Sequence, residues 1–128
     1  MAQIGSIGER LDIILRQGST LGPFIVTLTN PNGTPFDLTG ATISGQVRKN
    51  ATDTGNPIAT FDIVYINRVA GQFSFGMTKS VTALIPAGEY QKDDASQYKW
   101  DMELVDSLTR CIPLYYGNFE NFREVTRA

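Results

Sequence analysis

Few residues in this sequence could support catalysis. There is no histidine, so the side chain that most often serves as a general acid or base near neutral pH is absent. A Ser-His-Asp or Cys-His arrangement cannot be assembled within one chain for the same reason. Cys111 is the single cysteine, and its place in an alternating segment indicates a small strand residue and not a nucleophile. We therefore expect no catalytic residues and no enzymatic activity.

Two carboxylates fall on one face of a predicted strand. Asp101 and Glu103 alternate in "KWDMEL", which places them about 7 Å apart along a strand. Paired carboxylates at such a spacing resemble the acid and base of a glycosidase. Lys99 shares their face, and a mixed row of charges is typical of a solvated sheet surface. We interpret the pair as that surface.

The other acidic residues do not form a recognisable metal site. Asp93 and Asp94 lie together and Asp53 lies elsewhere, but their spacing matches no calcium-binding loop. The glycines at 5, 8, 18 and 22 form no phosphate-binding pattern between a strand and a helix. We expect no metal and no cofactor.

Length and charge restrict the class of protein. A chain of 128 residues with a net charge of −2 predicts one domain. It contains no run of Lys and Arg, so we expect no nucleic-acid partner. The longest apolar runs are only a few residues, so we expect no membrane span. The start "MAQIGSIGER" lacks the features of a signal peptide, which predicts synthesis and folding in a cytosol. We predict a flexible N-terminal arm at 1–9 and a single domain at 10–128.

Hydrophobic residues alternate with polar ones along most of the chain, as strands require because successive side chains point to opposite faces. The segments with this period are 10–17, 23–29, 41–49, 57–66, 72–77, 97–105 and 110–116. Turn residues separate them at Asn30–Gly33, Asp53–Asn56, Arg68–Gly71 and Asp106–Ser107. One helical turn is expected near Ser80–Leu84, ended by Pro86. The pattern predicts an all-β protein: an antiparallel, immunoglobulin-like β-sandwich of about seven to eight strands with at most one short helical turn.

The inward positions of these segments define a predicted core. It comprises Phe24, Val26, Leu28, Ile43, Val47, Phe61, Phe73, Phe75, Trp100, Met102 and Leu104. Trp100, the only tryptophan, is interpreted as a core residue of a central strand, with a sugar-stacking platform as the alternative.

Aromatic residues concentrate after the last clear strand. Tyr115, Phe119 and Phe122 lie in "YYGNFENF", and both core and interface positions are open for them at this point. A core already supplied by seven strands does not need them all, and exposed aromatics are typical anchors of protein contacts. We predict a partner interface formed by the aromatic tail, by Ile4 and Ile7 of the arm, and by the polar tip at 91–97. Its candidate residues are Ile4, Ile7, Tyr115, Phe119, Phe122, Asp93 and Asp94.

Four phrases carry a resemblance to a known family. They are "GTPFDLTGATISGQVRK", "AGQFSFGMTKSVTALIPAGEYQ", "YKWDMELVDSLTR" and "EVTRA". Together they resemble small bacteriophage virion proteins with an Ig-like β-sandwich, of the type of the N-terminal domain of the siphophage upper-baseplate protein. The resemblance covers nearly the whole chain after residue 10. Two segments depart from the pattern, the insertion "QKDDASQ" at 91–97 and the bulky aromatic closing segment, and both concern the partner surface.

The resemblance implies a structural protein of the phage particle. We expect an adaptor or connector in the tail, baseplate or fibre attachment that acts by protein–protein binding to other phage structural proteins. It would form a homo-oligomer in the virion after synthesis and assembly in the host cytoplasm. A head decoration protein and a carbohydrate-binding adhesion module are the alternatives.

Overall fold

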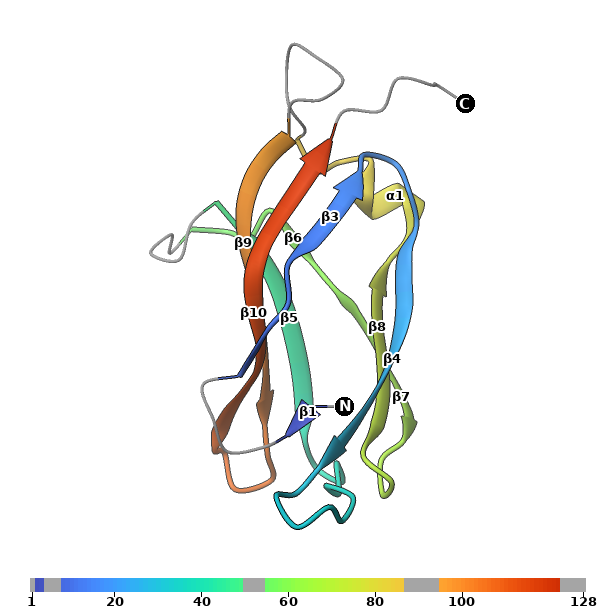
Figure 1. The fold of residues 1–128 in the computed structure, drawn as a ribbon, viewed down its shortest axis with the longest axis vertical. Coiled ribbons are helices and arrows are strands. Elements are labelled where there is room, and N and C mark those ends of the chain that lie inside the picture. The colour runs from blue at the N-terminus through green and yellow to red at the C-terminus, as the bar shows by residue number, and fades with distance from the viewer. Residues whose placement is uncertain (1, 4–7, 50–54, 87–94, 123–128) are drawn as a thin grey trace.

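Two β-sheets pack face to face across a shared apolar core (Figure 1). The computed structural model describes residues 2–3, 8–49, 55–86 and 95–122. One sheet has four strands in the order β1 (Ala2–Gln3), β4 (Leu21–Thr29), β8 (Gln72–Met77) and β7 (Asp62–Asn67). The other has six: β2 (Glu9–Arg10), β10 (Cys111–Phe122), β9 (Ala95–Val105), β5 (Thr42–Arg48) and β6 (Ala59–Thr60) follow one another, and β3 (Ile13–Arg16) also pairs with β10.

The all-β prediction is confirmed. Each of the seven alternating segments contains a strand, and the further strands are pieces of two residues. In the part of the chain that the structure describes, one helix is present, α1 (Lys79–Thr82), and it lies where a helical turn was expected. The turns at Asn30–Gly33 and Arg68–Gly71 are closed by backbone hydrogen bonds of 2.9 and 3.1 Å. Gly33 and Gly71 both have positive φ, a conformation that glycine adopts without strain.

Strand pairing is mostly antiparallel, with exceptions near the N-terminus. The ladders β4–β8, β7–β8, β5–β9 and β9–β10 are antiparallel. Strands β2 and β3 instead run parallel to β10, with Ile13 opposite Phe119. Strand β1 runs parallel to β4. The first three strands are therefore divided between the two sheets: β1 belongs to the four-stranded sheet, and β2 and β3 belong to the six-stranded sheet.

Ten of the eleven predicted core residues are buried, and Phe24 is the exception with 46% of its surface exposed. The pairing of β4 with β8 shifts by one residue between Leu21 and Phe24. Phe24 still contacts Phe75, with ring centroids 5.3 Å apart. At this position β4 borders the gap between the two sheets, so the other side of the Phe24 ring is left to solvent.

The predicted boundary of the N-terminal arm falls among short strands. Ala2–Gln3 and Glu9 belong to β1 and β2, which pair with β4 and β10. Residues 1 and 4–7 lie outside the described residues, so the flexibility of the arm stays a prediction.

Candidate functional site

The structure places two of the predicted interface aromatics in the core. Tyr115 is 8% exposed and Phe119 is fully buried, so the prediction that they are surface contact residues is wrong. The cause is a register shift between Pro113 and Tyr115 in the β9–β10 ladder. It reverses the alternation and turns Tyr115 inward in place of Tyr116. The Phe119 ring packs against Phe61, with centroids 6.4 Å apart.

The remaining candidates have different outcomes. Phe122 is half-buried at the end of β10, and the Arg16 guanidinium lies 5.9 Å from its ring centroid. Ile4, Ile7, Asp93 and Asp94 lie outside the described residues.

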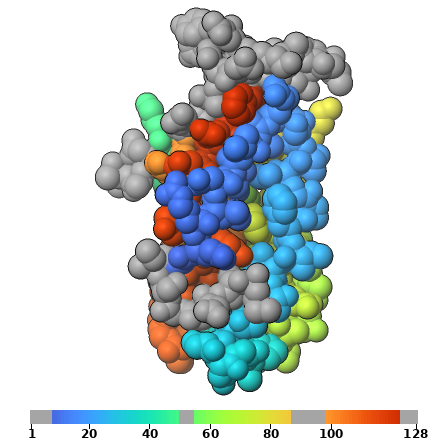
Figure 2. Space-filling view, viewed as in Figure 1, coloured from blue at the N-terminus to red at the C-terminus, as the bar shows by residue number. Residues whose placement is uncertain are grey.

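An apolar groove opens between β3 and β4, where the two sheets separate. It has a volume of about 390 Å³, and Figure 2 shows it between the blue strand β3 and the light-blue strand β4. Its lining residues are Leu11, Asp12, Ile13, Ile14, Leu21, Phe24, Ile25, Val26, Phe75 and Tyr115. Asp12 is the only charged residue among them. The groove exists because β3 pairs with β10 and β4 with β8, so these consecutive strands are joined by a short loop but belong to different sheets.

Large apolar side chains gather at this groove. Ile25 is 73% exposed, Ile14 is 68% and Leu11 is 40%, and the half-exposed Phe24 joins them. Scattered exposed apolar residues are normal, but a cluster around one depression marks a contact site. Sequence alternation alone did not predict this groove. Alternation assigns Phe24 to the inner face of its strand and assigns Ile14 and Ile25 to outer faces, so it gives no reason to expect the three side chains at one site.

The floor of the groove is aromatic. Phe75 packs against Trp100 and Tyr115 with centroids 6.1 Å apart in both pairs. Burial, and to a lesser extent the nearby Glu9 carboxylate, raises the pKa of Tyr115 above its ordinary value. The phenol is therefore neutral at physiological pH, and the floor presents no charge to a bound partner.

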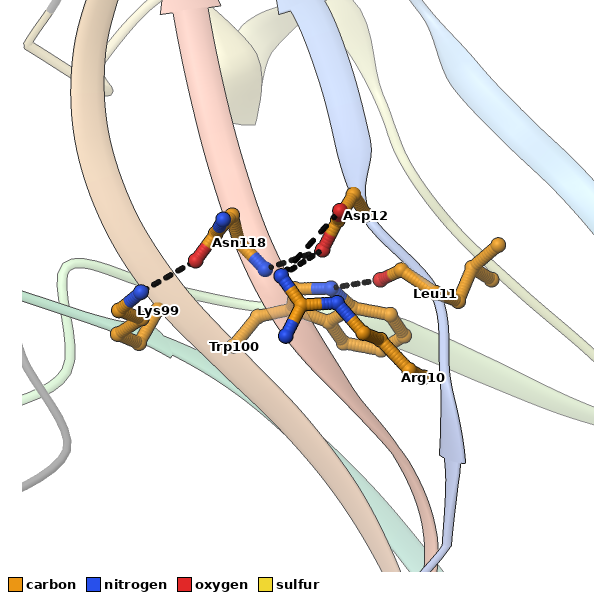
Figure 3. Close-up of polar contacts among 6 residues, drawn as sticks. All are labelled: Arg10, Leu11, Asp12, Lys99, Trp100 and Asn118. Carbon is orange, nitrogen blue, oxygen red and sulfur yellow. Dashed lines mark hydrogen bonds and ion pairs between the residues drawn. The ribbon is translucent and has the colours of Figure 1, made fainter.

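Polar contacts fix the segment between β2 and β3 against β10 and so define one wall of the groove (Figure 3). The Trp100 indole N–H donates to the Leu11 carbonyl at 2.7 Å. The Leu11 N–H donates to the Tyr116 carbonyl at 2.8 Å. The Asn118 N–H donates to the Asp12 carboxylate at 2.9 Å. We call Leu11, Asp12, Trp100 and Asn118 the wall cluster.

The charge of Asp12 is satisfied within the molecule. The Asn118 N–H and the nearby Arg10 guanidinium outweigh the opposing effect of burial and hold the pKa of Asp12 below its ordinary value. The Arg10 guanidinium lies 3.2 Å from the carboxylate. A partner in the groove therefore needs no cation for Asp12.

The carboxylate pair on β9 lies on the outer face of the six-stranded sheet. Partial burial, and then repulsion from Glu103, raises the pKa of Asp101. The thiol of Cys111, an exposed residue at the start of β10, donates to Glu103 at 3.1 Å. This contact and the negative surroundings raise the pKa of Cys111, which disfavours the thiolate that nucleophilic chemistry needs.

Trp100 is 3% exposed, as the core interpretation predicted, so its ring cannot serve as a surface platform for sugar. Within the described part of the chain, no group of three or more His, Cys, Asp or Glu side chains is placed to hold a metal ion. Of the described segments, none is a helix with the length and apolarity needed to cross a membrane.

Comparison with known proteins gives no family for this chain. No protein-family model matches it, and a search of the curated proteins finds no match.

Proposed function

We propose that this chain is a bacteriophage virion structural protein, an adaptor or connector in the tail, baseplate or fibre attachment that acts by protein–protein binding. The observation that carries the proposal is the apolar groove between β3 and β4, with its four exposed large apolar side chains and its internally satisfied Asp12. A groove of this kind suits an apolar segment of a protein partner. The resemblance of four sequence phrases to phage virion proteins supplies the particle as its setting.

An Ig-like arrangement is part of this proposal. The strand order supports it: four strands in the order β1, β4, β8, β7 face a sheet in which β10, β9, β5 and β6 are neighbours. In an immunoglobulin-like sandwich, strands B and E are neighbours in one sheet, and strands C, F and G form the other. Here β4 and β8 would take the places of B and E, and β5, β9 and β10 those of C, F and G.

Different observations bear on the two alternatives to this proposal. A head decoration protein would use a similar groove at a different place on the particle. A carbohydrate-binding module needs an exposed aromatic platform, and Trp100, the residue considered for that role, is buried. Binding to other phage structural proteins therefore remains the function we propose.

The test is mass spectrometry of purified particles from the host that carries the gene, with an image reconstruction that locates the protein. We expect the chain in the particle, in a copy number set by the local symmetry, at the tail, baseplate or fibre attachment. Density on the head would favour the decoration alternative, and absence from particles would refute a virion role.

A matched pair of variants tests the groove itself. Ile14→Ser with Phe24→Ser removes two exposed apolar side chains at the groove, and Thr42→Ala with Ser44→Ala changes the exposed outer face of β5. Both variants are first checked for cooperative thermal unfolding. We expect the groove variant to fold but fail to enter particles, and the β5 variant to enter normally. Equal incorporation of the two would exclude the groove as the assembly surface.

A further inference from the structure

Strand β4 has a free edge at the groove. The order of the four-stranded sheet places β8 on one side of β4 and β1 on the other. Strand β1 pairs only with Leu28 and Thr29, whereas β8 pairs with β4 between Leu21 and Thr27. Among the described residues, no strand therefore pairs with the groove side of β4 before Leu28. A free strand edge presents backbone N–H and C=O groups that can bind another chain.

The register of the β4–β8 ladder shows which backbone groups lie at this edge. The Leu28 N–H donates to the Gly71 carbonyl at 2.9 Å, and the same register places Val26 opposite Phe73. In an antiparallel ladder, alternate residues direct both backbone groups to the partner strand, and the residues between them direct both groups away. Leu28 and Val26 thus face β8, and the N–H and C=O of Ile25 face the groove side.

The opposite side of the groove has the same arrangement. The Gln17 N–H donates to the Phe122 carbonyl at 2.7 Å, and β3 pairs with β10 in an unbroken parallel register. Odd-numbered residues of β3 therefore face β10, and the backbone groups of Ile14 face away from it. Two free edges, one from each sheet, thus border the groove (Figure 2).

We propose that the free edge of β4 binds an extended segment of a partner protein, which adds a strand to the four-stranded sheet at the groove. In this β-augmentation mode, main-chain hydrogen bonds give affinity and alternate side chains give specificity. The edge already binds a strand in this way, because β1 pairs with it at Leu28 and Thr29. The partner strand would lie in line with β1. The inference rests on the proposed function, since it names the kind of partner segment that the groove would receive.

The lining of the groove specifies the side chains of that segment. Successive residues of a strand point to opposite faces, so every second residue of the added strand points inward, beside Phe24 and Val26. The floor there is formed by Phe75 and Tyr115, and an apolar floor without charge selects apolar side chains. The outward residue lies beside Ile25, where a β-branched residue packs well across strands. The segment is therefore extended, with apolar residues at every second position and no charge on its inner side.

Hydrogen exchange of the purified full chain, followed by NMR, tests whether the edge is free. We expect the Ile25 amide to exchange at least about tenfold faster than the Val26 amide, because only the Val26 amide faces β8. Equal protection of the two amides would overturn the proposal, because the edge would already be covered.

A panel of short synthetic peptides is the probe for the partner segment. Each has Val, Ile or Phe at alternate positions with Thr between them and Lys at both ends for solubility. Each is matched by the same peptide with N-methyl groups on its backbone nitrogens, which removes the donors that strand pairing needs. We expect at least one unmodified peptide to bind and protect the Ile25 amide. We expect its methylated match to bind at least about tenfold more weakly, which corresponds to about 1.4 kcal/mol. A panel with no binding at millimolar concentration would overturn the proposal, as would equal binding of the methylated peptides.

Two substitutions at Ile25 separate strand pairing from apolar packing. Ile25→Pro removes the N–H that faces the groove, and proline is tolerated at strand edges. Ile25→Thr keeps the N–H and removes most of the apolar side chain. We expect Ile25→Pro to lose peptide binding and Ile25→Thr to keep it within about threefold. Equal binding by the two folded variants would overturn the proposal. If Ile25→Pro does not unfold cooperatively, the methylated peptides decide the question.

The position of amide protection identifies the occupant. Protection of the Ile14 amide alone by the peptide would place the strand on β3 and overturn the assignment to β4. Dimerisation without peptide that protects the Ile25 amide would make a second copy the occupant and overturn the proposal. Absence of the protein from phage particles would refute the virion role and leave peptide binding standing. A protein that is present in particles but binds no peptide would overturn this inference alone.

Discussion

Two aspartates of this protein respond to pH with opposite sign. The pKa of Asp12 is lowered in the folded protein by the Asn118 N–H and by Arg10. Folding therefore favours its charged form, and the stabilisation is present above the unfolded pKa of about 3.9 and lost as the pH falls through the folded pKa. Asp12→Asn should lower the free energy of unfolding at pH 7 and have little effect at pH 2. Urea unfolding at the two pH values measures it.

Asp101 provides the opposite case and serves as the control. Partial burial and Glu103 raise its pKa, so folding favours the protonated form. That contribution is present at low pH and is lost as the pH rises through the folded pKa. Asp101→Asn should therefore raise the free energy of unfolding at pH 7 and leave it nearly unchanged at pH 2. Effects of the same sign for the two variants would show that the wall cluster does not stabilise the charge of Asp12.

Phe119 and Phe122 differ in their roles although they lie on the same strand. Phe119 is fully buried, so Phe119→Ser should cost at least about 3–5 kcal/mol, comparable with the whole stability of many small domains. Phe122 is half-buried beside Arg16, so Phe122→Ser should cost less than half as much. Thermal unfolding followed by circular dichroism compares them. A folded Phe119→Ser variant of unchanged stability would return this residue to the surface role first predicted for it.

At the scale of the elements, the docking of β2 and β3 on β10 depends on Gly117. A Cβ atom at this position would lie within 3.0 Å of the Leu11 carbonyl oxygen, which accepts the hydrogen bond from Trp100. Gly117→Ala should cost about 1–3 kcal/mol through steric overlap and change the Trp100 fluorescence. Urea unfolding and emission spectra measure the two effects.

Gly33→Asn is the matched control for this prediction. Gly33 has positive φ, and a Cβ atom added there would meet no other atom within 4 Å. Asparagine accepts that conformation better than most residues. We expect a change within about 0.5 kcal/mol and the fluorescence of the unchanged protein. If Gly117→Ala behaved in the same way, Leu11 would not be held against β10 as the structure places it.

Alternation predicted the strands but not all of their faces. Strands β5, β8 and β9 have the predicted sides. The β5–β9 ladder is regular, and where the β4–β8 and β9–β10 ladders shift register, the extra residue lies in the partner strand β4 or β10. Tyr115 was misplaced because one irregular residue pair in β10 reverses every later assignment. Phe24 was misplaced because alternation gives the side of a strand and says nothing of whether another element covers that side. The groove could not be predicted for the same reason, since it depends on β3 joining one sheet and β4 the other.

At the scale of the whole molecule, the N-terminal strands link the two sheets. Ile13 and Leu15 of β3 are buried, and Leu11 accepts the indole hydrogen bond from β9. The β1 pairing, in contrast, involves only Ala2 and Gln3. We therefore expect the N-terminal region to stabilise the fold mainly through residues after 9. Leu11 and Asp12 belong to the wall cluster, and Ile13 and Leu15 belong to the core.

Two truncated chains test this distribution. The chain 9–128 keeps β2, β3 and the wall cluster, and we expect it to unfold cooperatively within a few degrees of the full protein. The chain 17–128 loses Ile13 and Leu15 from the core, each worth about 2–5 kcal/mol, and exposes the edge of β10. Because small domains have a total stability of about 5–15 kcal/mol, we expect no cooperative transition. Differential scanning calorimetry of the two chains measures it. A chain 17–128 that unfolds at the temperature of the full protein would show that β3 is only an accessory strand, and that the remaining strands close the sandwich without it.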